Sequence, residues 1–421
     1  MESKLKVVWV CHFSDAKTRA HIRFSRFYFK RILKIILGKP AEKWIDFAVW
    51  NSNAIKQFES FKDIELTIIF PHQGIKGKSQ RFVIDGINYV CFRSEDDHFW
   101  PYFKKRFLNK PNLHFFKNRE FVRNTIEELK PDIVHVIGAE NPYYSITVLE
   151  IPKNIPSIVS LQTLLSDPDF FSNYPISKSD YDFRSSIEKD VIRHCNYIGS
   201  KIEKFRATII RDIKADAVFL DTRLAVGVEI DERVTEKIYD FVYFAGNINK
   251  AADHAIEAFA IAHKVNPSLT LNISGYYSES YKAQLDKRIS KLGVQESIFF
   301  TGEKASHDEV ISQIKKSKYA LLPLKIDVLS STIREAMACG LPVITTRTPD
   351  TPLLNKECEC VLLSEVGDYK GMADNMIRLV DNKEYGDLLR KNGYAVVKKL
   401  YDNKTFMEEL KATYFSIINK W

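Results

Sequence analysis

Apolar runs rich in β-branched residues alternate along the chain with longer stretches in which apolar residues recur at helical spacing. The runs predict buried strands, and the longer stretches predict amphipathic helices. This alternation is typical of βα units, in which helices cover a sheet of mostly parallel strands, so the pattern predicts an α/β fold. In the first half of the chain we expect strands within LKVVWVCH, ELTIIFP, DIVHVIG and PSIVSLQ, and helices near residues 42–60, 118–130, 143–150 and 183–195.

The second half of the chain shows the same pattern with greater regularity. We expect strands within FVYFAG, LTLNISG, SIFFTG, YALLPL, LPVITT and CVLLS, and helices near residues 251–264, 279–292, 307–316, 330–339 and 370–380. Two doubly wound sheets in series are the simplest architecture, with their boundary in the mixed polar stretch 219–240. Because ligands of such sheets bind beyond the carboxyl ends of the strands, candidate chemistry is expected directly after the strands.

Composition agrees with a two-domain globular protein. The 421 residues exceed one ordinary core, 45% of them are hydrophobic, and no apolar run reaches the ~18 residues that cross a bilayer. The N-terminus enters a strand pattern without a secretory signal, so the expected compartment is the cytoplasm. The six cysteines are scattered and predict reduced, structural thiols, while Asp167 and Asp169 are interpreted as part of a turn. With no spaced histidine pair either, we expect no metal requirement and no tightly bound cofactor.

Positive charge is concentrated in the first half of the chain. The net charge is +8, and residues 1–220 hold 35 Lys and Arg against 26 Asp and Glu. Residues 17–43 alone carry nine basic residues and one acidic residue, mixed with aromatic and aliphatic side chains. Such a segment fits an interfacial helix at a membrane surface, and equally a buried helix with a solvated basic face. No nucleic-acid-binding motif accompanies the charge, so nucleic acid is not an expected partner.

The stretch DVLSSTIREAMACGLPVI, residues 327–344, combines a helix start with two acids. Ser330 or Ser331 can cap a helix that ends near Gly340, and its first amides, at Ser331 and Thr332, suit phosphate oxygens. Asp327 in the preceding loop and Glu335 inside the helix can each accept two hydroxyl donors, as ribose or a sugar would offer. The alternative is that both acids are solvated surface residues.

Two further strand ends carry candidate binding residues. The strand FVYFAG ends at Gly246, and the loop from Asn247 to Lys250 then opens a helix. A helix start disfavours a cation, so Lys250 there suggests an anionic partner such as a diphosphate. Another strand ends at Gly302, where the lack of a side chain would let the backbone approach a flat ring closely.

In combination these residues resemble a known family. The chain has an acid, Asp327, then seven residues, then Glu335 followed by AMACGLPV, and residues 241–370 contain AGNINK…IEAF, LNISG and FTGEK in that order. This combination is similar to the donor-binding domain of GT-B glycosyltransferases of family 4, the glycosyl transferases group 1. The resemblance implies a GT-B fold of two Rossmann-like doubly wound domains facing a cleft. Residues 1–220 would form the acceptor-binding domain, residues 221–400 the nucleotide-sugar-binding domain, and a helix within 401–421 would pack back onto the first.

The resemblance also implies roles for individual residues. Glu335 would hold ribose, Asp327 the donor sugar, and Lys250 the diphosphate, with Gly246 and Asn247 in the same loop. The implied phosphate contacts come from Ser330, Ser331, Thr332 and, near the cleft, Arg206, and the base contacts from Gly302 and Lys304. This chain departs from the family in having Asp327 in place of Glu, Asn247 in place of a frequent Arg, and VLSS in place of a Gly-Phe-Gly-like turn.

The first half resembles the family more weakly. No glycine follows the first strand, which is followed by His12, and Ile137 occupies a position where many members carry a histidine. His135 is expected to pack inside its strand, and Glu140 and Asn141 are placed to meet the acceptor.

The activity implied by the resemblance is transfer of a sugar from a nucleotide sugar, a UDP- or GDP-sugar, to a hydroxyl of a glycan or lipid-linked acceptor. Transfer with retention, without a metal, in assembly of cell-surface polysaccharide or glycolipid is expected. The enzyme would be cytoplasmic, with residues 17–43 as a candidate for peripheral association with the inner face of the membrane. The alternatives are a nucleotide-sugar epimerase of the same fold and a catalytically inactive nucleotide-binding subunit.

Overall fold

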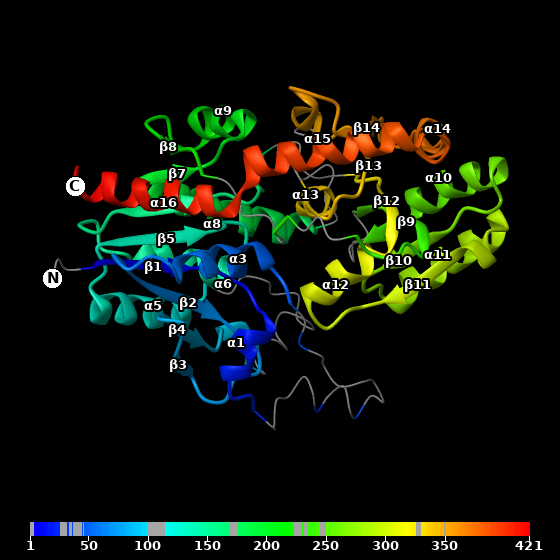
Figure 1. Ribbon diagram of the computed structural model, residues 1–421. Helices are drawn as coiled ribbons and strands as arrows, with labels where there is room; N and C mark the ends of the chain where they lie inside the picture. Colours follow the sequence, from blue (N-terminus) through cyan, green and yellow to red (C-terminus); the bar gives the residue numbers. More distant parts are fainter. Residues whose placement is uncertain are drawn as a thin grey trace. The chain divides into compact units, whose positions relative to one another are not determined.

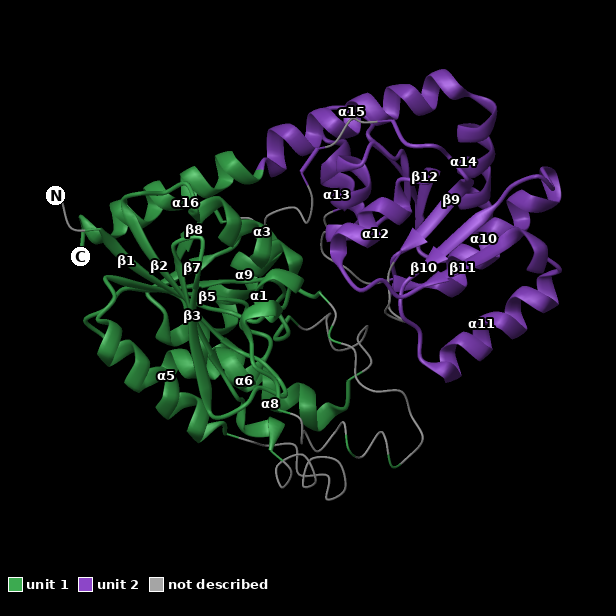
Figure 2. Cartoon of the chain, turned by 60° about the horizontal axis from the view of Figure 1, so that its bottom comes forward, with its two compact units in different colours: residues 1–225, 403–421 green, residues 226–402 purple. Residues whose placement is uncertain are grey.

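Two sheets, each with helices on both faces, organise the chain (Figure 1). The computed structural model describes residues 4–25, 32, 36, 44, 46–98, 114–167, 176–222, 229–230, 234–244, 250–325, 330–348 and 351–421. The chain divides into unit 1, Met1–Ala225 with Asn403–Trp421, and unit 2, Val226–Asp402 (Figure 2). Most of the basic segment 17–43 lies outside the described residues. In the part of the chain that the structure describes, no helix is both long and apolar enough to span a membrane.

The sheet of unit 1 has eight strands in the order β3-β4-β2-β1-β5-β6-β7-β8. All neighbouring strands are parallel except the pair β3 and β4. Every residue of β5 is buried, as expected of a parallel strand that is covered on both faces. The strands are β1 (Leu5–Val10), β2 (Ile64–Pro71), β3 (Ser79–Ile84), β4 (Ile87–Phe92), β5 (Ile133–Ile137), β6 (Ser157–Ser160), β7 (Tyr197–Gly199) and β8 (Val218–Leu220).

Helices cover both faces of this sheet, with α3 and α16 on one face and α5, α6 and α8 on the other (Figure 2). Val7 and Trp9 of β1 share a hydrophobic cluster with Ile55 of α3 and Met407 of α16. The helices of unit 1 are α1 (Ala16–His21), α3 (Val49–Phe58), α5 (Phe116–Leu129), α6 (Pro142–Ser145), the 3-10 helix η2 (Ile146–Glu150), α8 (Lys178–His194), α9 (Glu203–Asp212) and α16 (Asn403–Ile418).

A buried hydrogen-bond chain fastens α16 to the centre of the sheet. Trp9 Nε1 donates to the Tyr414 hydroxyl at 2.8 Å, and this hydroxyl lies 2.6 Å from His135 Nδ1. His135 Nε2 lies 2.7 Å from the Ser160 hydroxyl on β6, so both ring nitrogens are satisfied. His135 is 1% exposed, which confirms the expectation that it packs inside its strand. At the surface, Lys411 pairs with Asp63 at 2.7 Å.

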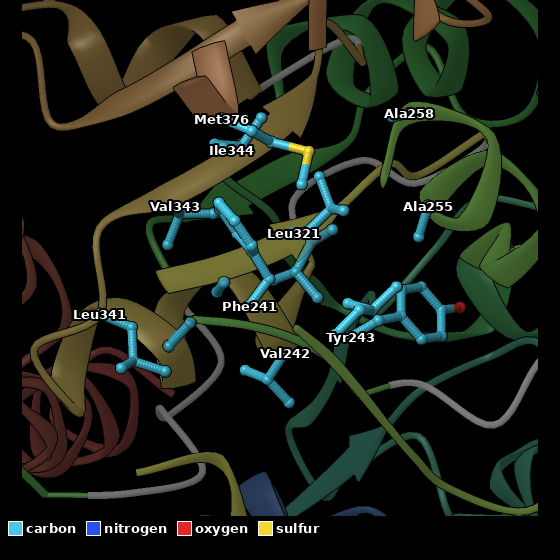
Figure 3. Close-up of a cluster of buried hydrophobic side chains, with 14 of the residues drawn as sticks. Phe241, Val242, Tyr243, Ala255, Ala258, Leu321, Leu341, Val343, Ile344 and Met376 are labelled. Atoms are coloured by element: carbon cyan, nitrogen blue, oxygen red, sulfur yellow. The ribbon is translucent and has the colours of Figure 1, made fainter. Parts of the chain in front are cut away.

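Unit 2 is built on six parallel strands in the order β11-β10-β9-β12-β13-β14. Side chains of the central strands β9 and β12 pack with Met376 and the alanines of α10 in its core (Figure 3). The strands are β9 (Tyr239–Phe244), β10 (Leu271–Ser274), β11 (Ile298–Gly302), β12 (Ser317–Leu322), β13 (Val343–Thr346) and β14 (Val361–Ser364). The helices are α10 (Ala252–Val265), α11 (Glu279–Leu292), α12 (His307–Ile314), α13 (Ser331–Ala338), α14 (Tyr369–Asp381) and α15 (Lys383–Tyr401).

The predicted architecture of two doubly wound α/β sheets is confirmed, and the differences are local. The expected strands and helices of the second half all appear, while α15 was not anticipated. In unit 1 the sequence reading missed the hairpin β3–β4, the three-residue strands β7 and β8, and α9. The hairpin turns at Asp85 and Gly86, whose φ angles are 48° and 80°. An Asp-Gly pair between two alternating apolar runs is a hairpin signal that the sequence did carry.

The hydrogen-bond chain at Tyr414 makes a first prediction. Tyr414→Phe leaves the Trp9 N–H and a His135 nitrogen without their buried partner, so unit 1 should lose about 1–3 kcal/mol of unfolding free energy. Chemical denaturation followed by tryptophan fluorescence measures this change. All tryptophans of the chain fall in unit 1, namely Trp9, Trp44, Trp50, Trp100 and Trp421, so their fluorescence reports on that unit. The control Tyr276→Phe alters a tyrosine that is 59% exposed in unit 2 and should leave the transition unchanged.

A second prediction concerns acid. Burial lowers the pKa of His135 to about 3, whereas an unfolded histidine has a pKa of about 6.5. Between these values only the unfolded state binds the proton, so this contribution to stability is complete above about pH 6.5 and falls as pH drops toward 3. The pKa of His12 is also lowered to about 3, so His12 likewise makes the folded state less stable as pH falls. Burial raises the pKa of Glu188 to about 7, so the stability that Glu188 contributes has the opposite pH dependence and is lost as pH rises above about 4.5.

We therefore expect unit 1 to lose stability between pH 6.5 and 4, and His135→Gln to reduce that slope by up to about 1.4 kcal/mol per pH unit. Denaturation curves at several pH values measure the slope. His114→Gln, at an exposed histidine of the same unit, is the matched control. An unchanged slope in His135→Gln would show that this ring is not kept neutral by the fold.

Candidate functional site

The candidate residues lie where parallel strands end. In each sheet the carboxyl ends of the parallel strands meet at one edge, so loops that are far apart in sequence come together there. In unit 2 this edge carries Lys250, which precedes α10, and the amino end of α13. Of the predicted residues, Asp327, Gly246 and Asn247 lie outside the described part of the chain.

The amino end of α13 is joined to Lys250 by a hydrogen bond. Ser330 occupies the cap position with extended backbone angles, but its side chain does not cap the helix. Its hydroxyl instead accepts from Lys250 Nζ at 3.0 Å and lies 2.7 Å from the Thr332 hydroxyl. The first amides of the helix, at Ser331 and Thr332, therefore have no side-chain cap, and an ammonium group stands beside them. This arrangement can hold a phosphate.

Glu335 lies one turn into the same helix and is 6% exposed. Within the described residues its carboxylate forms no hydrogen bond or ion pair. The neighbouring Arg334 does not pair with it and lies over the Tyr401 ring, 5.1 Å from the centroid. A buried carboxylate without a protein partner is expensive unless a ligand supplies hydrogen-bond donors, so Glu335 is a candidate for binding paired hydroxyls.

Backbone strain is found directly after Lys250. The following residue, Ala251, is fully buried and has φ 62° and ψ 54°, in the left-handed region that a side chain disfavours. Two residues further on, Asp253 in the first turn of α10 pairs with Lys325 at 3.0 Å. Lys325 was not predicted as a site residue, although its position directly after β12 was the available signal.

The predicted base-binding residues lie at the end of β11. Gly302 has φ 69°, and a Cβ atom there would have no heavy atom within 4 Å. The glycine is thus required by its backbone angle, while the space in front of it is open. Lys304 Nζ donates to the Thr301 carbonyl at 2.9 Å, which folds the lysine back over this strand end.

In unit 1 a second group of polar residues gathers at the carboxyl ends of β1 and β5. We call His12, Glu140, Asn141, Tyr143 and Arg184 the carboxyl-edge cluster. The His12 ring packs against Phe47, with centroids 4.4 Å apart, and the Tyr143 hydroxyl is hydrogen-bonded to its Nδ1. Burial, and secondarily the charge of His72, lowers the pKa of His12 to about 3, so the ring is neutral.

The Glu140 carboxyl group of this cluster faces the protein interior. Its Oε1 accepts from Asn141 Nδ2 at 3.0 Å and from the Tyr144 hydroxyl at 3.5 Å, and its Oε2 is buried without a hydrogen-bond partner in the described part of the chain. Gly138, with φ 93°, makes room for it, because a Cβ there would lie 2.8 Å from Oε2 and 2.4 Å from the Tyr144 oxygen. Burial raises the pKa of Glu140. The group that sequence reasoning placed toward an acceptor therefore points inward.

Arg184 of α8 was missed by sequence reasoning. Its Nε donates to the Glu140 carbonyl at 3.0 Å, and its Nη2 lies 3.5 Å from Asn141 Oδ1. The sequence places this arginine on a predicted helix but contains no signal for the loop that it meets. Its position follows only from how α8 packs on α6 and η2.

Arg206, predicted near donor phosphates, is engaged within unit 1. Its Nε donates to the Ser200 carbonyl at 2.7 Å, and it also pairs with Asp221. Asp167, half of the Asp-Pro-Asp sequence, is buried and pairs with Lys204 at 3.0 Å, and Asp169 lies outside the described residues. Among the residues that the structure describes, no group of three or more His, Cys, Asp or Glu side chains is placed to hold a metal ion.

Comparison with known proteins finds similarity in sequence and in fold. Residues 231–396 match the family model described as glycosyl transferases group 1. An N-acetyl-alpha-D-glucosaminyl L-malate synthase of Bacillus anthracis is 25% identical over 130 residues, 31% of this chain, and the match spans only 33% of that relative. An uncharacterized glycosyltransferase of Methanocaldococcus jannaschii is 23% identical over 311 residues, which cover 71% of this chain and 82% of that protein.

Solved structures share the whole fold at low identity. A sucrose-phosphate synthase from Thermosynechococcus elongatus matches with a TM-score of 0.67 and 13% identity, over 99% of this chain and 100% of that chain. Anabaena HepE, in a complex with UDP, matches with a TM-score of 0.64 and 13% identity, over 98% and 100% of the two chains. Residues 231–396 therefore match the glycosyl transferases group 1, and the chain as a whole has the GT-B fold.

Proposed function

We propose that this protein transfers a sugar from a nucleotide sugar, a UDP- or GDP-sugar, to a hydroxyl of a glycan or lipid-linked acceptor with retention, in assembly of cell-surface glycans. The observation that carries the proposal is the end of α13. There an uncapped helix start, the Lys250 ammonium and the buried Glu335, which has no hydrogen-bond partner among the described residues, belong to one short helix and the residue hydrogen-bonded to its start. Phosphate, positive charge and paired hydroxyls are the features that these groups recognise.

In this proposal unit 2 binds the donor. The diphosphate lies at the Ser331 and Thr332 amides and beside Lys250, the ribose hydroxyls bind Glu335, and the base lies near Gly302 and Lys304. Asp327 contacts the transferred sugar. Support for a uridine donor comes from proteins of the same fold, since HepE is described in complexes with UDP and with UDP-glucose and the pneumococcal transferase GtfA with UDP and GlcNAc.

Sugar transfer requires that the enzyme stabilise the leaving group. As the bond between the sugar and the phosphate breaks, negative charge develops on the departing diphosphate, and Lys250 with the α13 amides stabilises that charge. Arg206 is a further candidate cation. Because these groups supply the positive charge, the proposal invokes no metal. Unit 1 binds the acceptor near His12, Glu140 and Asn141, and the hydroxyl attacks from the face that the leaving group vacates, which gives retention.

The role of Glu335 predicts a nucleotide-dependent stability change. In a thermal-shift series with UDP, GDP, ADP and their sugars, one base series should raise the melting temperature, because ligands that bind the folded state stabilise it. Glu335→Gln removes a charged acceptor of two hydroxyl bonds, each of roughly 1.5–3 kcal/mol, so affinity should fall at least about tenfold. Glu296→Gln, at an exposed glutamate of the same unit, is the control. Unchanged affinity in Glu335→Gln would refute the ribose assignment.

The role of Lys250 predicts a change in phosphate preference. The wild type should bind the nucleoside diphosphate more tightly than the monophosphate of the same base, and Lys250→Met should reduce this preference about tenfold, because one charge-assisted contact is lost. Transfer rate should fall by more than donor affinity, since the charge develops as the bond breaks. Lys291→Met, at an exposed lysine, is the control. Calorimetry and release of nucleoside diphosphate measure both quantities.

The same assays separate the alternatives. A nucleotide-binding subunit would show the thermal shift without release of nucleoside diphosphate in the presence of acceptor. An epimerase would return an altered nucleotide sugar without transfer. If no nucleotide raised the melting temperature, the proposal itself would fall.

A further inference from the structure

Arg184 presents unused hydrogen-bond donors at the carboxyl-edge cluster. A guanidinium has five N–H groups in a fixed fork. Here Nε is used by the Glu140 carbonyl at 3.0 Å, and one Nη2 hydrogen approaches Asn141 Oδ1 at the long distance of 3.5 Å. The remaining N–H groups make no hydrogen bond to a described residue, although Nη1 forms an ion pair with Asp180 at 3.8 Å, a distance longer than a hydrogen bond. The side chain is 20% exposed, so it is held in place yet reachable.

His12 adds a neutral donor to the same cluster. Burial raises the pKa of Tyr143, so its hydroxyl keeps its proton. Because His12 Nδ1 is the partner of this hydroxyl among the described residues, we assign the hydroxyl as the donor and Nδ1 as the acceptor. A neutral imidazole that accepts at Nδ1 carries its hydrogen at Nε2. No described residue accepts a hydrogen bond from His12 Nε2. The ring therefore offers an N–H group whose orientation is fixed by Tyr143 and Phe47.

Two carboxyl groups near the cluster, those of Glu140 and Glu188, are held by protein groups, whereas Asp180 faces Arg184. Glu140 Oε2 is buried against Gly138, and Oε1 is held by Asn141 and Tyr144. The Gln162 amide is best satisfied when its oxygen accepts from Trp50 Nε1, and in that orientation its nitrogen donates to the same Glu140 Oε1 at 3.3 Å. Glu188 of α8 accepts from the amides of Leu165 and Ser166, at 2.9 and 2.7 Å. What the cluster leaves available is thus an excess of N–H donors, on a guanidinium whose charge Asp180 balances in part.

We infer that the carboxyl-edge cluster selects an anionic acceptor, a hydroxylated molecule that carries a carboxylate or phosphate group, with Arg184 as the residue that binds the anion. The planar fork of an arginine matches the two oxygens of either group, whereas the hydroxyls of a neutral sugar accept hydrogen bonds but bring no negative charge. His12 Nε2 then donates to an oxygen of the same molecule. The word acceptor rests on the proposed function, but the binding preference does not.

Matched sugar probes test the preference directly, without any nucleotide. Glucuronate and glucose 6-phosphate differ from glucose by one anionic group, carboxylate in the first and phosphate in the second. Tryptophan fluorescence reports on unit 1 alone, and Trp50 Nε1 lies 3.2 Å from the Gln162 amide oxygen, next to Glu140. We expect at least one anionic probe to bind ten or more times tighter than glucose, and the two arms to show whether the carboxylate or the phosphate is preferred.

Variants identify the residue responsible. Arg184→Gln should remove the preference, a loss of at least tenfold for the anionic probe with glucose unchanged. Arg184→Lys keeps the positive charge without the planar fork and should retain part of the preference for the anionic probe. Because this variant should still bind, it shows that a loss in Arg184→Gln does not come from a folding defect. The matched control is Arg193→Gln on the same helix, where the side chain is 51% exposed and its Nη1 pairs with Asp190 at 3.2 Å. It should bind like the wild type.

Failure of this inference differs from failure of the proposed function. If nucleotides stabilise the protein and a donor is turned over, but glucose, glucuronate and glucose 6-phosphate bind equally, the acceptor class inferred here is wrong and the transferase proposal stands. If no nucleotide binds, yet Arg184 still confers the anion preference, the transferase proposal is wrong and the inferred anion preference stands. Loss of the preference in Arg193→Gln as well would assign it to general charge on α8 and would also overturn the inference.

Discussion

Parallel strand pairing is the constraint on which both candidate sites depend. Central strands such as β5 and β9 are covered by helices on both faces, so their interiors accept almost only apolar side chains. Polar side chains therefore occur mainly at the first residues beyond the strands, and parallel pairing brings those residues together at one edge of the sheet. His12 and Glu140 follow β1 and β5 in unit 1, and Lys250 and Ser330 follow β9 and β12 in unit 2.

Burial decides which of the groups at these edges carry charge. His12 stays neutral, and the raised pKa of Glu140 shows that its environment disfavours the ionised form. Arg184, on the other hand, brings a guanidinium group to this edge, and the α13 amides present partial positive charge because no side chain of the described residues caps them. Both units therefore present donors and positive charge at their strand ends. That common character suits a reaction in which a diphosphate leaves and, by our inference, an anionic acceptor arrives.

Particular residues show how far the sequence could be read. The doubly wound sheets and the positions of Ser330, Ser331 and Thr332 at a helix start followed from apolar periodicity and from the motif around Glu335, and the structure has them there. The strands β7 and β8 were missed because three residues are too few to show a period. Arg184 was missed for a different reason. Its neighbours come from a loop more than forty residues away, and no local pattern encodes that contact.

The sequence by itself determined the alternation of strands and helices, the family resemblance of the second half and the identity of the acid, lysine and hydroxyl residues at the strand ends, because these depend on local periodicity and short spacings. Only the tertiary structure decided which way those groups face. It turned the Glu140 carboxyl group inward over Gly138, joined Lys250 to Ser330 across 80 positions and closed α16 onto unit 1 through Tyr414 and His135. Burial and hydrogen-bond partners are set by packing between distant segments, which a linear pattern does not contain.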